Sequence, residues 1–196
     1  EERKSFRREV VQEKHAHDYV SYVDKASEKK VVSALRKLLP EAGFIAEEGS
    51  AAYSDETYCW VVDPLDGTTN YIHDNAPYCV SIALRDKQSL LLGVVYEPCR
   101  DECFYAWKGG GAYVNGERLR VSLVSEPKDA FVVTELPYNF EQYARTGEHL
   151  IHELYGKVAG IRMNGSAALA LCYVAAGRFD AWLEAFIGKW DFSAAA

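Results

Sequence analysis

The sequence of residues 60–70 is Trp60-Val61-Val62-Asp63-Pro64-Leu65-Asp66-Gly67-Thr68-Thr69-Asn70, and it combines three features of a ligand site. An apolar run that predicts a strand ends at Asp63, where Pro64 stops sheet pairing. Asp66 follows, and two neighbouring carboxylates repel each other unless cations lie between them. Gly67 and Thr68 resemble the start of a helix, where N–H groups and hydroxyls bind phosphate oxygens. As separate dipeptides these residues would predict a β-turn and a threonine N-cap, but the whole string favours a ligand site.

The pattern on either side of this stretch predicts a mixed chain of helices and strands. Upstream, apolar residues recur with the helical period between Asp24 and Pro40. Downstream, strands dominate, and Asn115-Gly116 predicts a two-residue hairpin turn. Further helices are predicted at residues 141–158 and 166–176. The predicted strands are residues 44–46, 58–62, 81–84, 90–96, 103–107, 112–114, 119–121, 131–134 and 179–183. This order favours a layered α+β or α/β sandwich.

The bulk composition is that of a globular domain. The chain has 196 residues, 48% of them hydrophobic, which is enough for one domain with a core. No apolar run approaches the length that spans a bilayer, and the charged start is not a signal peptide. We therefore expect a cytoplasmic protein without a membrane partner. The five cysteines are scattered and odd in number, so they predict reduced thiols rather than a disulfide framework.

The charge balance restricts the partners. The net charge is −7, from 29 acidic and 22 basic residues. An acidic surface argues against general nucleic-acid binding, which requires basic patches. It would also repel a phosphate-bearing substrate, and bound divalent cations would resolve that conflict locally.

Four segments resemble the inositol monophosphatase family, the lithium-sensitive, magnesium-dependent phosphatases. Residues 60–70 resemble its first signature, and Trp190-Asp191 followed by small residues resembles its second. The acidic pair in residues 44–48 and the segment 165–167 also match. The resemblance covers the chain from about Lys14 onward. It implies a layered αβαβα sandwich of the inositol monophosphatase/fructose-1,6-bisphosphatase type.

The resemblance also implies a set of metal ligands. Glu47, Asp63 and the carbonyl of Leu65 would hold one Mg²⁺ ion, and Asp63, Asp66 and Asp191 would hold a second. A third, more weakly bound ion would lie near Glu47. The chemistry of the ligands agrees, because Mg²⁺ prefers hard oxygen ligands and these motifs contain no histidine or cysteine.

The same matches imply the catalytic and substrate-binding groups. Thr68 would hold the attacking water and Asp24 would accept a hydrogen bond from Thr68. Without the resemblance, the sequence around Asp24 favours a helix N-cap instead. Attack on phosphorus would be in line, without a covalent phosphoenzyme. Glu184 would bind substrate hydroxyls, while the alternative for this residue is a surface charge. Backbone groups would bind phosphate or line the substrate pocket at Gly67, Thr68, Gly165, Ser166 and Ala167.

The chain differs from the family at its two ends. It stops at Ala196, soon after the second signature, and it begins within what would be the first helix. We therefore expect one domain, residues 1–196, that is truncated at both ends and lacks the family's C-terminal segment. Because a helix that short is not stable alone, we expect Asp191 to be poorly ordered or to need further segments.

The expected function is hydrolysis of a small phosphate monoester, with myo-inositol monophosphate as the first choice. Thr69-Asn70 favours this branch over the nucleotide 3′-phosphatases of the superfamily. Fructose-1,6-bisphosphatase and histidinol-phosphate phosphatase activities remain alternatives, as does a non-catalytic regulatory protein that binds a protein or RNA partner. A homodimer is expected by resemblance alone.

Overall fold

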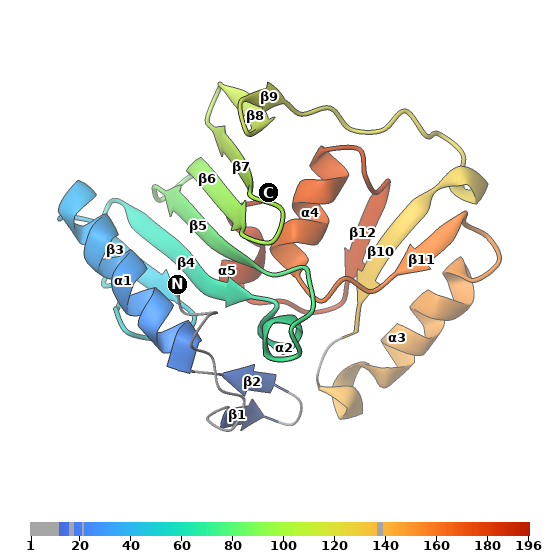
Figure 1. The fold of residues 1–196 in the computed structure, drawn as a ribbon, viewed down its shortest axis with the longest axis horizontal. Coiled ribbons are helices and arrows are strands. Elements are labelled where there is room, and N and C mark those ends of the chain that lie inside the picture. Colours follow the sequence, from blue (N-terminus) through green and yellow to red (C-terminus); the bar gives the residue numbers. More distant parts are fainter. Residues whose placement is uncertain (1–11, 16–17, 21, 137–138) are drawn as a thin grey trace.

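A computed structural model describes residues 12–15, 18–20, 22–136 and 139–196. Its elements are stacked in the order helix, sheet, helix, sheet, helix (Figure 1). Helix α1 (Tyr22–Leu38) covers one face of a large sheet, and α4 (Ala167–Ala175) lies between that sheet and a smaller one. Helix α3 (Phe140–Leu154) lies on the far side of the smaller sheet. The predicted αβαβα sandwich is therefore confirmed.

The large sheet has seven strands in the order β3-β4-β5-β6-β7-β8-β9. Strands β3 and β4 are parallel, and every later pair of neighbours is antiparallel. Short turns connect the strands from β5 to β9, whereas residues 67–78 with helix α2 (Thr68–Ile72) connect β4 to β5. The strands are β3 (Gly43–Ala46), β4 (Cys59–Asp66), β5 (Cys79–Arg85), β6 (Leu90–Glu97), β7 (Glu102–Trp107), β8 (Gly111–Val114) and β9 (Glu117–Arg118).

The core of the large sheet forms on β4. Every residue of this strand is buried, as expected for a continuous apolar run covered on both faces. Trp60 and Val62 of β4 pack with Val32 and Leu35 of α1, so the helical period found in the sequence marks the face that contacts the sheet. This packing fixes the strand end where Asp63 lies.

The small sheet is parallel throughout. Its order is β11 (Gly160–Arg162), β10 (Phe131–Glu135) and β12 (Ala181–Glu184). Helix α4 is apolar on all sides, and it packs between Val133 of this sheet and Val95 and Phe104 of the large one. Because α4 joins the two sheets, its first residues lie next to the end of β4.

Some element boundaries differ from the sequence prediction. Helix α3 ends at Leu154, four residues early, because Gly156 adopts a left-handed φ of 75° that breaks the helix. By resemblance, the chain was expected to begin within the family's first helix. Instead, β1 (Gln12–His15) and β2 (Asp18–Val20) form an antiparallel hairpin, consistent with the strand propensity of Tyr19 and Val20.

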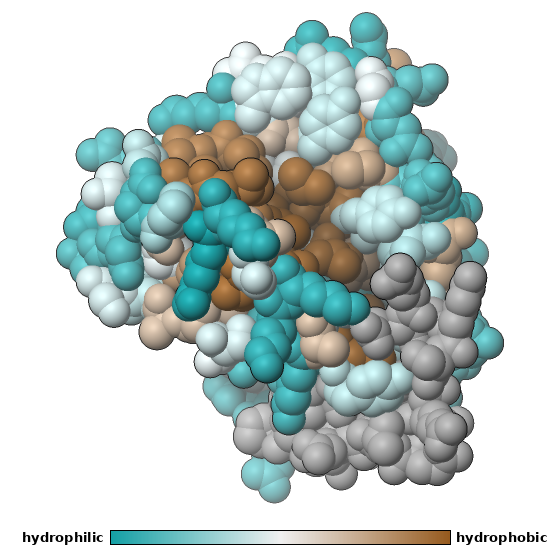
Figure 2. Space-filling model, turned by 60° about the vertical axis from the view of Figure 1, so that its left-hand side comes forward, coloured by the Kyte–Doolittle hydropathy of each residue, from teal (hydrophilic) through white to brown (hydrophobic). Residues whose placement is uncertain are grey.

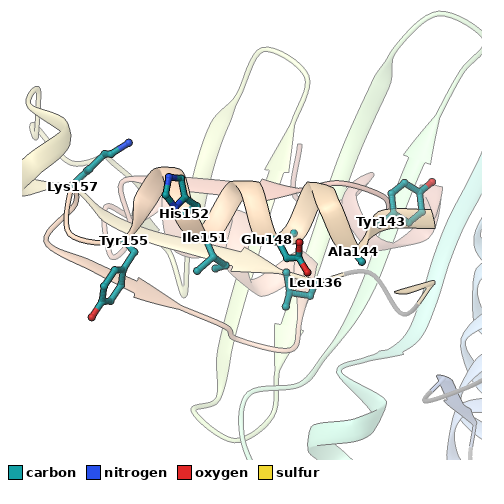
Figure 3. A pocket seen from close by; sticks show the side chains of 9 residues that line it. Leu136, Tyr143, Ala144, Glu148, Ile151, His152, Tyr155 and Lys157 are labelled. Atoms are coloured by element: carbon teal, nitrogen blue, oxygen red, sulfur yellow. The ribbon is translucent and has the colours of Figure 1, made fainter. Parts of the chain in front are cut away.

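The surface carries apolar areas away from the acidic residues. On the face drawn in Figure 2, apolar surface gathers at the centre and hydrophilic side chains surround it. A groove of about 700 Å³ runs along α3 and is lined by Leu136, Tyr143, Ala144, Gly147, Glu148, Ile151, His152, Tyr155 and Lys157 (Figure 3). None of the site residues predicted from the sequence lines it. All five cysteines are free thiols, and no helix among the described residues is both long and apolar enough to cross a membrane.

Candidate metal and phosphate site

The end of β4 presents two carboxylates close together. The pairing of β4 with β5 shifts between Asp63 and Asp66, because Pro64 cannot donate to the ladder. The backbone turns here, and the Leu65 N–H donates to Asp63 Oδ1 at 2.9 Å. Both carboxylates are nearly inaccessible, with Asp63 1% and Asp66 8% exposed. The strand end predicted from the sequence thus becomes a buried acidic turn.

Asp191 joins these two carboxylates from the C-terminal helix α5 (Lys189–Phe192). One carboxylate oxygen from each of Asp63, Asp66 and Asp191 lies within 4.8 Å of the others. The Gly188 N–H donates to Asp191 Oδ2 at 2.6 Å, which fixes the side chain at the start of the helix. The three carboxylates that the resemblance assigned to one metal ion therefore converge.

The short helix α5 is held by the large sheet. Ser81 Oγ of β5 donates to the Trp190 carbonyl at 3.2 Å. Gly93 of β6 lies so close to Ala194 that an added Cβ would be 2.0 Å from its carbonyl oxygen. The sequence predicted a poorly ordered Asp191 because a helix this short is not stable alone. In the structure, these two contacts with the large sheet hold α5 in position.

Asp66 is oriented by the start of α4. Its Oδ2 accepts hydrogen bonds from Ser166 Oγ at 2.6 Å and from the Ala168 N–H at 2.8 Å. Ser166 is also the N-cap of α4, where its side chain accepts from the Leu169 N–H. The segment 165–167 that the sequence assigned to substrate binding therefore also contacts a predicted metal ligand.

Thr68 and Asp24 are in direct contact. The Thr68 hydroxyl lies 2.8 Å from Asp24 Oδ1 and 3.0 Å from the Leu65 carbonyl oxygen, so two acceptors compete for one proton. Asp24 is 1% exposed and lies within the first turn of α1, which begins at Tyr22, so it is not the N-cap. Thr68 begins α2 (Thr68–Ile72) directly after Gly67. The contact implied by the resemblance is present, and its role in catalysis stays a prediction.

Glu47 approaches the cluster from the loop after β3. Its N–H donates to the Val62 carbonyl at 3.2 Å, which ties the loop to β4. The loop is also held by Glu28, a completely buried residue of α1 that the sequence analysis missed. Glu28 Oε2 accepts from the Glu48 N–H at 2.7 Å, and Oε1 accepts from the Ser50 N–H at 2.8 Å. The sequence feature that could have identified Glu28 is its position one helical turn after Asp24, on the same face of the helix.

The electrostatics of the cluster favour bound cations. Burial raises the pKa of Asp63 well above its usual value, and the charges of Glu47, Asp66 and Asp191 raise it further. Burial also raises the pKa of Asp66, to about 6, against hydrogen bonds that lower it. Crowded, buried carboxylates are costly without a counter-charge, and carboxylate oxygens are the ligands that Mg²⁺ prefers. The residues present therefore fit a magnesium site.

Two glutamates face this cluster from the small sheet. Glu135 of β10 and Glu184 of β12 are register partners at the ends of parallel strands. Burial raises the pKa of Glu184 to about 8, and the charges of Glu135, Asp191 and Asp66 add to the shift. Glu184 Oε2 is buried without a hydrogen-bond partner among the described residues. Glu184 is thus no solvated surface charge, whereas the sequence analysis did not single out Glu135.

Comparisons with known proteins agree with this geometry. The model of the inositol monophosphatase family matches residues 1–196. Nus factor SuhB of Escherichia coli (strain K12) is 42% identical over 183 residues, which cover 93% of this chain and 68% of that protein. Inositol-1-monophosphatase of Rhizobium meliloti (strain 1021) is 41% identical over 182 residues, covering 90% and 67%. The crystal structure of extragenic suppressor protein suhB from Bartonella henselae superposes with a TM-score of 0.90 at 39% identity, covering 94% of this chain and 71% of that one.

Proposed function

The chain belongs to the inositol monophosphatase family, and from that premise we propose that it hydrolyses a small phosphate monoester in a Mg²⁺-dependent reaction. The observation that carries the proposal is the convergence within 4.8 Å of one carboxylate oxygen from each of Asp63 and Asp66, in a buried turn, and Asp191, on the half-buried helix α5. Buried acids of this kind are expensive unless a divalent ion binds them, and phosphate hydrolysis is a reaction that such ions serve.

The ligands proposed for two Mg²⁺ ions and a weaker third are Glu47, Asp63, the Leu65 carbonyl, Asp66 and Asp191. When bound, Mg²⁺ would neutralise charge on the phosphate and activate water for attack. The protein supplies the positions of these ligands. The turn between Asp63 and Asp66 fixes two of them, and the Gly188 N–H fixes Asp191.

Thr68 and Asp24 are proposed to orient the attacking water. When the Thr68 hydroxyl donates to Asp24, its oxygen keeps lone pairs that can accept a hydrogen bond from water. Accepting that bond would aim the water's own lone pair at phosphorus and increase its basicity. Glu47 is the third proposed catalytic residue, because it is a proposed ligand of the Mg²⁺ ions that would activate the water.

The substrate is proposed to lie between the two sheets. Gly67 and Thr68 would bind the phosphate through their N–H groups, and Gly165, Ser166 and Ala167 would line the same pocket. Glu184 would bind a substrate hydroxyl group, because its Oε2 is buried without a hydrogen-bond partner among the described residues. A polyol phosphate such as myo-inositol monophosphate fits this combination, and the R. meliloti relative bears that activity in its name.

The test is a phosphate-release assay with Mg²⁺ and with EDTA. The substrates are myo-inositol 1-phosphate, fructose 1,6-bisphosphate, histidinol phosphate and a nucleoside 3′-phosphate. We expect Mg²⁺-dependent turnover that is fastest on the inositol ester and is inhibited by millimolar Li⁺. No release from any ester in the presence of Mg²⁺ would refute the proposal, and turnover without sensitivity to Li⁺ would count against this branch of the family.

A second candidate function is a non-catalytic, partner-binding role. It is favoured by the name of the E. coli relative, Nus factor SuhB, at 42% identity. The acidic balance and the convergence of three predicted ligands, Asp63, Asp66 and Asp191, argue for the first proposal. Tight binding of a protein or RNA partner by a chain without turnover would favour the second.

A further inference from the structure

Glu135 contacts the backbone of a distant segment. Its Oε1 accepts hydrogen bonds from the Asn164 N–H at 2.5 Å and from the Gly165 N–H at 2.7 Å. These two residues form the turn directly before α4 and its N-cap Ser166. One carboxylate oxygen thus holds two consecutive N–H groups, an arrangement in which charged hydrogen bonds are strong.

The same turn is held on its other side by Asn70. Asn70 Nδ2 donates to the Asn164 carbonyl at 2.9 Å and to the Pro77 carbonyl at 2.7 Å. Gly165 has a φ of 74°, and an added Cβ would lie 2.7 Å from Asn70 Nδ2. The turn is therefore fixed between an amide of α2 and a carboxylate of β10.

The position of this turn determines how Asp66 is held. Ser166 Oγ and the Ala168 N–H, which bind Asp66 Oδ2 at 2.6 and 2.8 Å, follow the turn by one and three residues. The Cys79 thiol also donates to Asp66 Oδ2, at the longer distance of 3.6 Å. A shift of the turn would move Ser166 Oγ and the Ala168 N–H together.

We propose that Glu135 is a positioning residue: by holding the N–H groups of Asn164 and Gly165 it sets the start of α4, and thereby the orientation of Asp66 for Mg²⁺ binding. This inference rests on the proposed metal site. Through Glu135, the small sheet would influence how tightly Asp66 of the large sheet binds Mg²⁺.

The test compares Glu135→Ala and Glu135→Gln with Asp180→Ala. Glutamine keeps an acceptor oxygen at Oε1 and should restore most of what alanine removes. Asp180 is the matched control, because its Oδ2 accepts the Phe131 N–H at 2.5 Å at the opposite end of β10. Both alanine variants remove a carboxylate that accepts from backbone N–H groups, and thermal unfolding checks that all variants fold.

Two readouts separate positioning from a local structural role. In Glu135→Ala we expect the Ala168 amide to exchange its hydrogen about tenfold faster and the Kd for Mg²⁺, measured by calorimetry without substrate, to rise about tenfold. Asp180→Ala should leave both quantities within about twofold of the wild type. The proposal is overturned if only the amides of residues 164 and 165 respond, if Asp180→Ala has the same effects, or if the wild type binds no Mg²⁺. A wild type that binds Mg²⁺ but releases no phosphate would refute the proposed function alone.

Discussion

The two sides of the acidic site are built differently. On the large-sheet side, Asp63 and Asp66 belong to β4, in which every residue is buried. On the other side, Ser166 and the Ala168 N–H at the start of α4 bind Asp66, and helix α5, which carries Asp191, is held on the large sheet through Ser81 and Gly93. The comparison indicates that two of the charges are placed by a buried strand, whereas Asp191 and the groups that orient Asp66 are placed by a few contacts between distant segments.

The largest effect on activity is expected from removing the charge of Asp63, at the end of the buried strand β4. Asp63→Asn keeps the shape but removes a ligand shared by both proposed ions, so Mg²⁺-dependent phosphate release should fall at least ~10³-fold. Asp129→Asn, at an exposed position, should leave the rate unchanged. An undiminished rate in Asp63→Asn would remove the metal site from the proposal.

The next largest effect is expected where α5 meets the large sheet. Gly93→Ala places a Cβ 2.0 Å from the Ala194 carbonyl oxygen, so the segment that carries Asp191 must move. Overpacking of this kind costs about 1–3 kcal/mol of stability, and we expect the Kd for Mg²⁺ to rise roughly 10- to 100-fold.

The control for this prediction is Gly43→Ala. The atoms nearest to its Cβ would belong to the side chains of Tyr53 and Glu56, which can move aside more easily than backbone. Calorimetric titration with Mg²⁺ compares the two variants. Equal affinities would show that α5 is not placed through Gly93.

A smaller effect is expected at the loop that carries Glu47. Glu28→Ala removes the acceptor of the Glu48 and Ser50 N–H groups, so the Kd for Mg²⁺ should rise about tenfold and stability should fall by ~2–3 kcal/mol. Glu28→Gln keeps one acceptor oxygen and should lie between alanine and the wild type. Denaturant unfolding and Mg²⁺ titration check both, with the exposed Glu41→Ala as control; wild-type affinity in Glu28→Ala would contradict the role.

The smallest effect concerns a buried acid away from the cluster. Glu97 is completely buried, and burial raises its pKa although the Tyr173 hydroxyl donates to Oε2 at 3.1 Å. Because the folded state binds the proton more tightly than the unfolded state, Glu97 contributes stability at acidic pH that is lost as the pH rises through its folded pKa. Glu97→Gln should therefore reduce the loss of Tm between about pH 5 and pH 8 by roughly 1–4 °C at saturating Mg²⁺. An unchanged pH dependence would show that this acid stays ionised in the folded protein.

Much of the fold was predictable because its signals are local. The apolar run before Asp63 and the helical period between Asp24 and Pro40 predicted β4 and α1 as the structure has them, within a few residues. The family resemblance supplied the layered architecture, which periodicity alone left open between α+β and α/β. The groups chosen from the motifs lie together because each motif marks the end of a strand or the start of a helix.

The groups that were missed act over long sequence distances. Glu28 binds N–H groups 20 and 22 positions away, and Glu135 binds groups 29 and 30 positions away. The helical spacing of Glu28 from Asp24 indicates that both lie on one face of α1, but no spacing pattern in a single sequence shows which remote N–H groups a carboxylate will bind. For the same reason, the anchoring of α5 on Ser81 and Gly93 was not predictable from the short helix itself.

Gly67 restricts which sequences can build this site at all. Its φ of 93° strains any other residue, and an added Cβ would lie 3.0 Å from the carbonyl oxygens of both Pro77 and Gly165. A combinatorial library that randomises residues 60–70 and selects for folded protein should thus recover glycine at this position whatever the ligands become. A design that puts new chemistry on this scaffold can replace the acidic residues, but it must keep glycine at position 67.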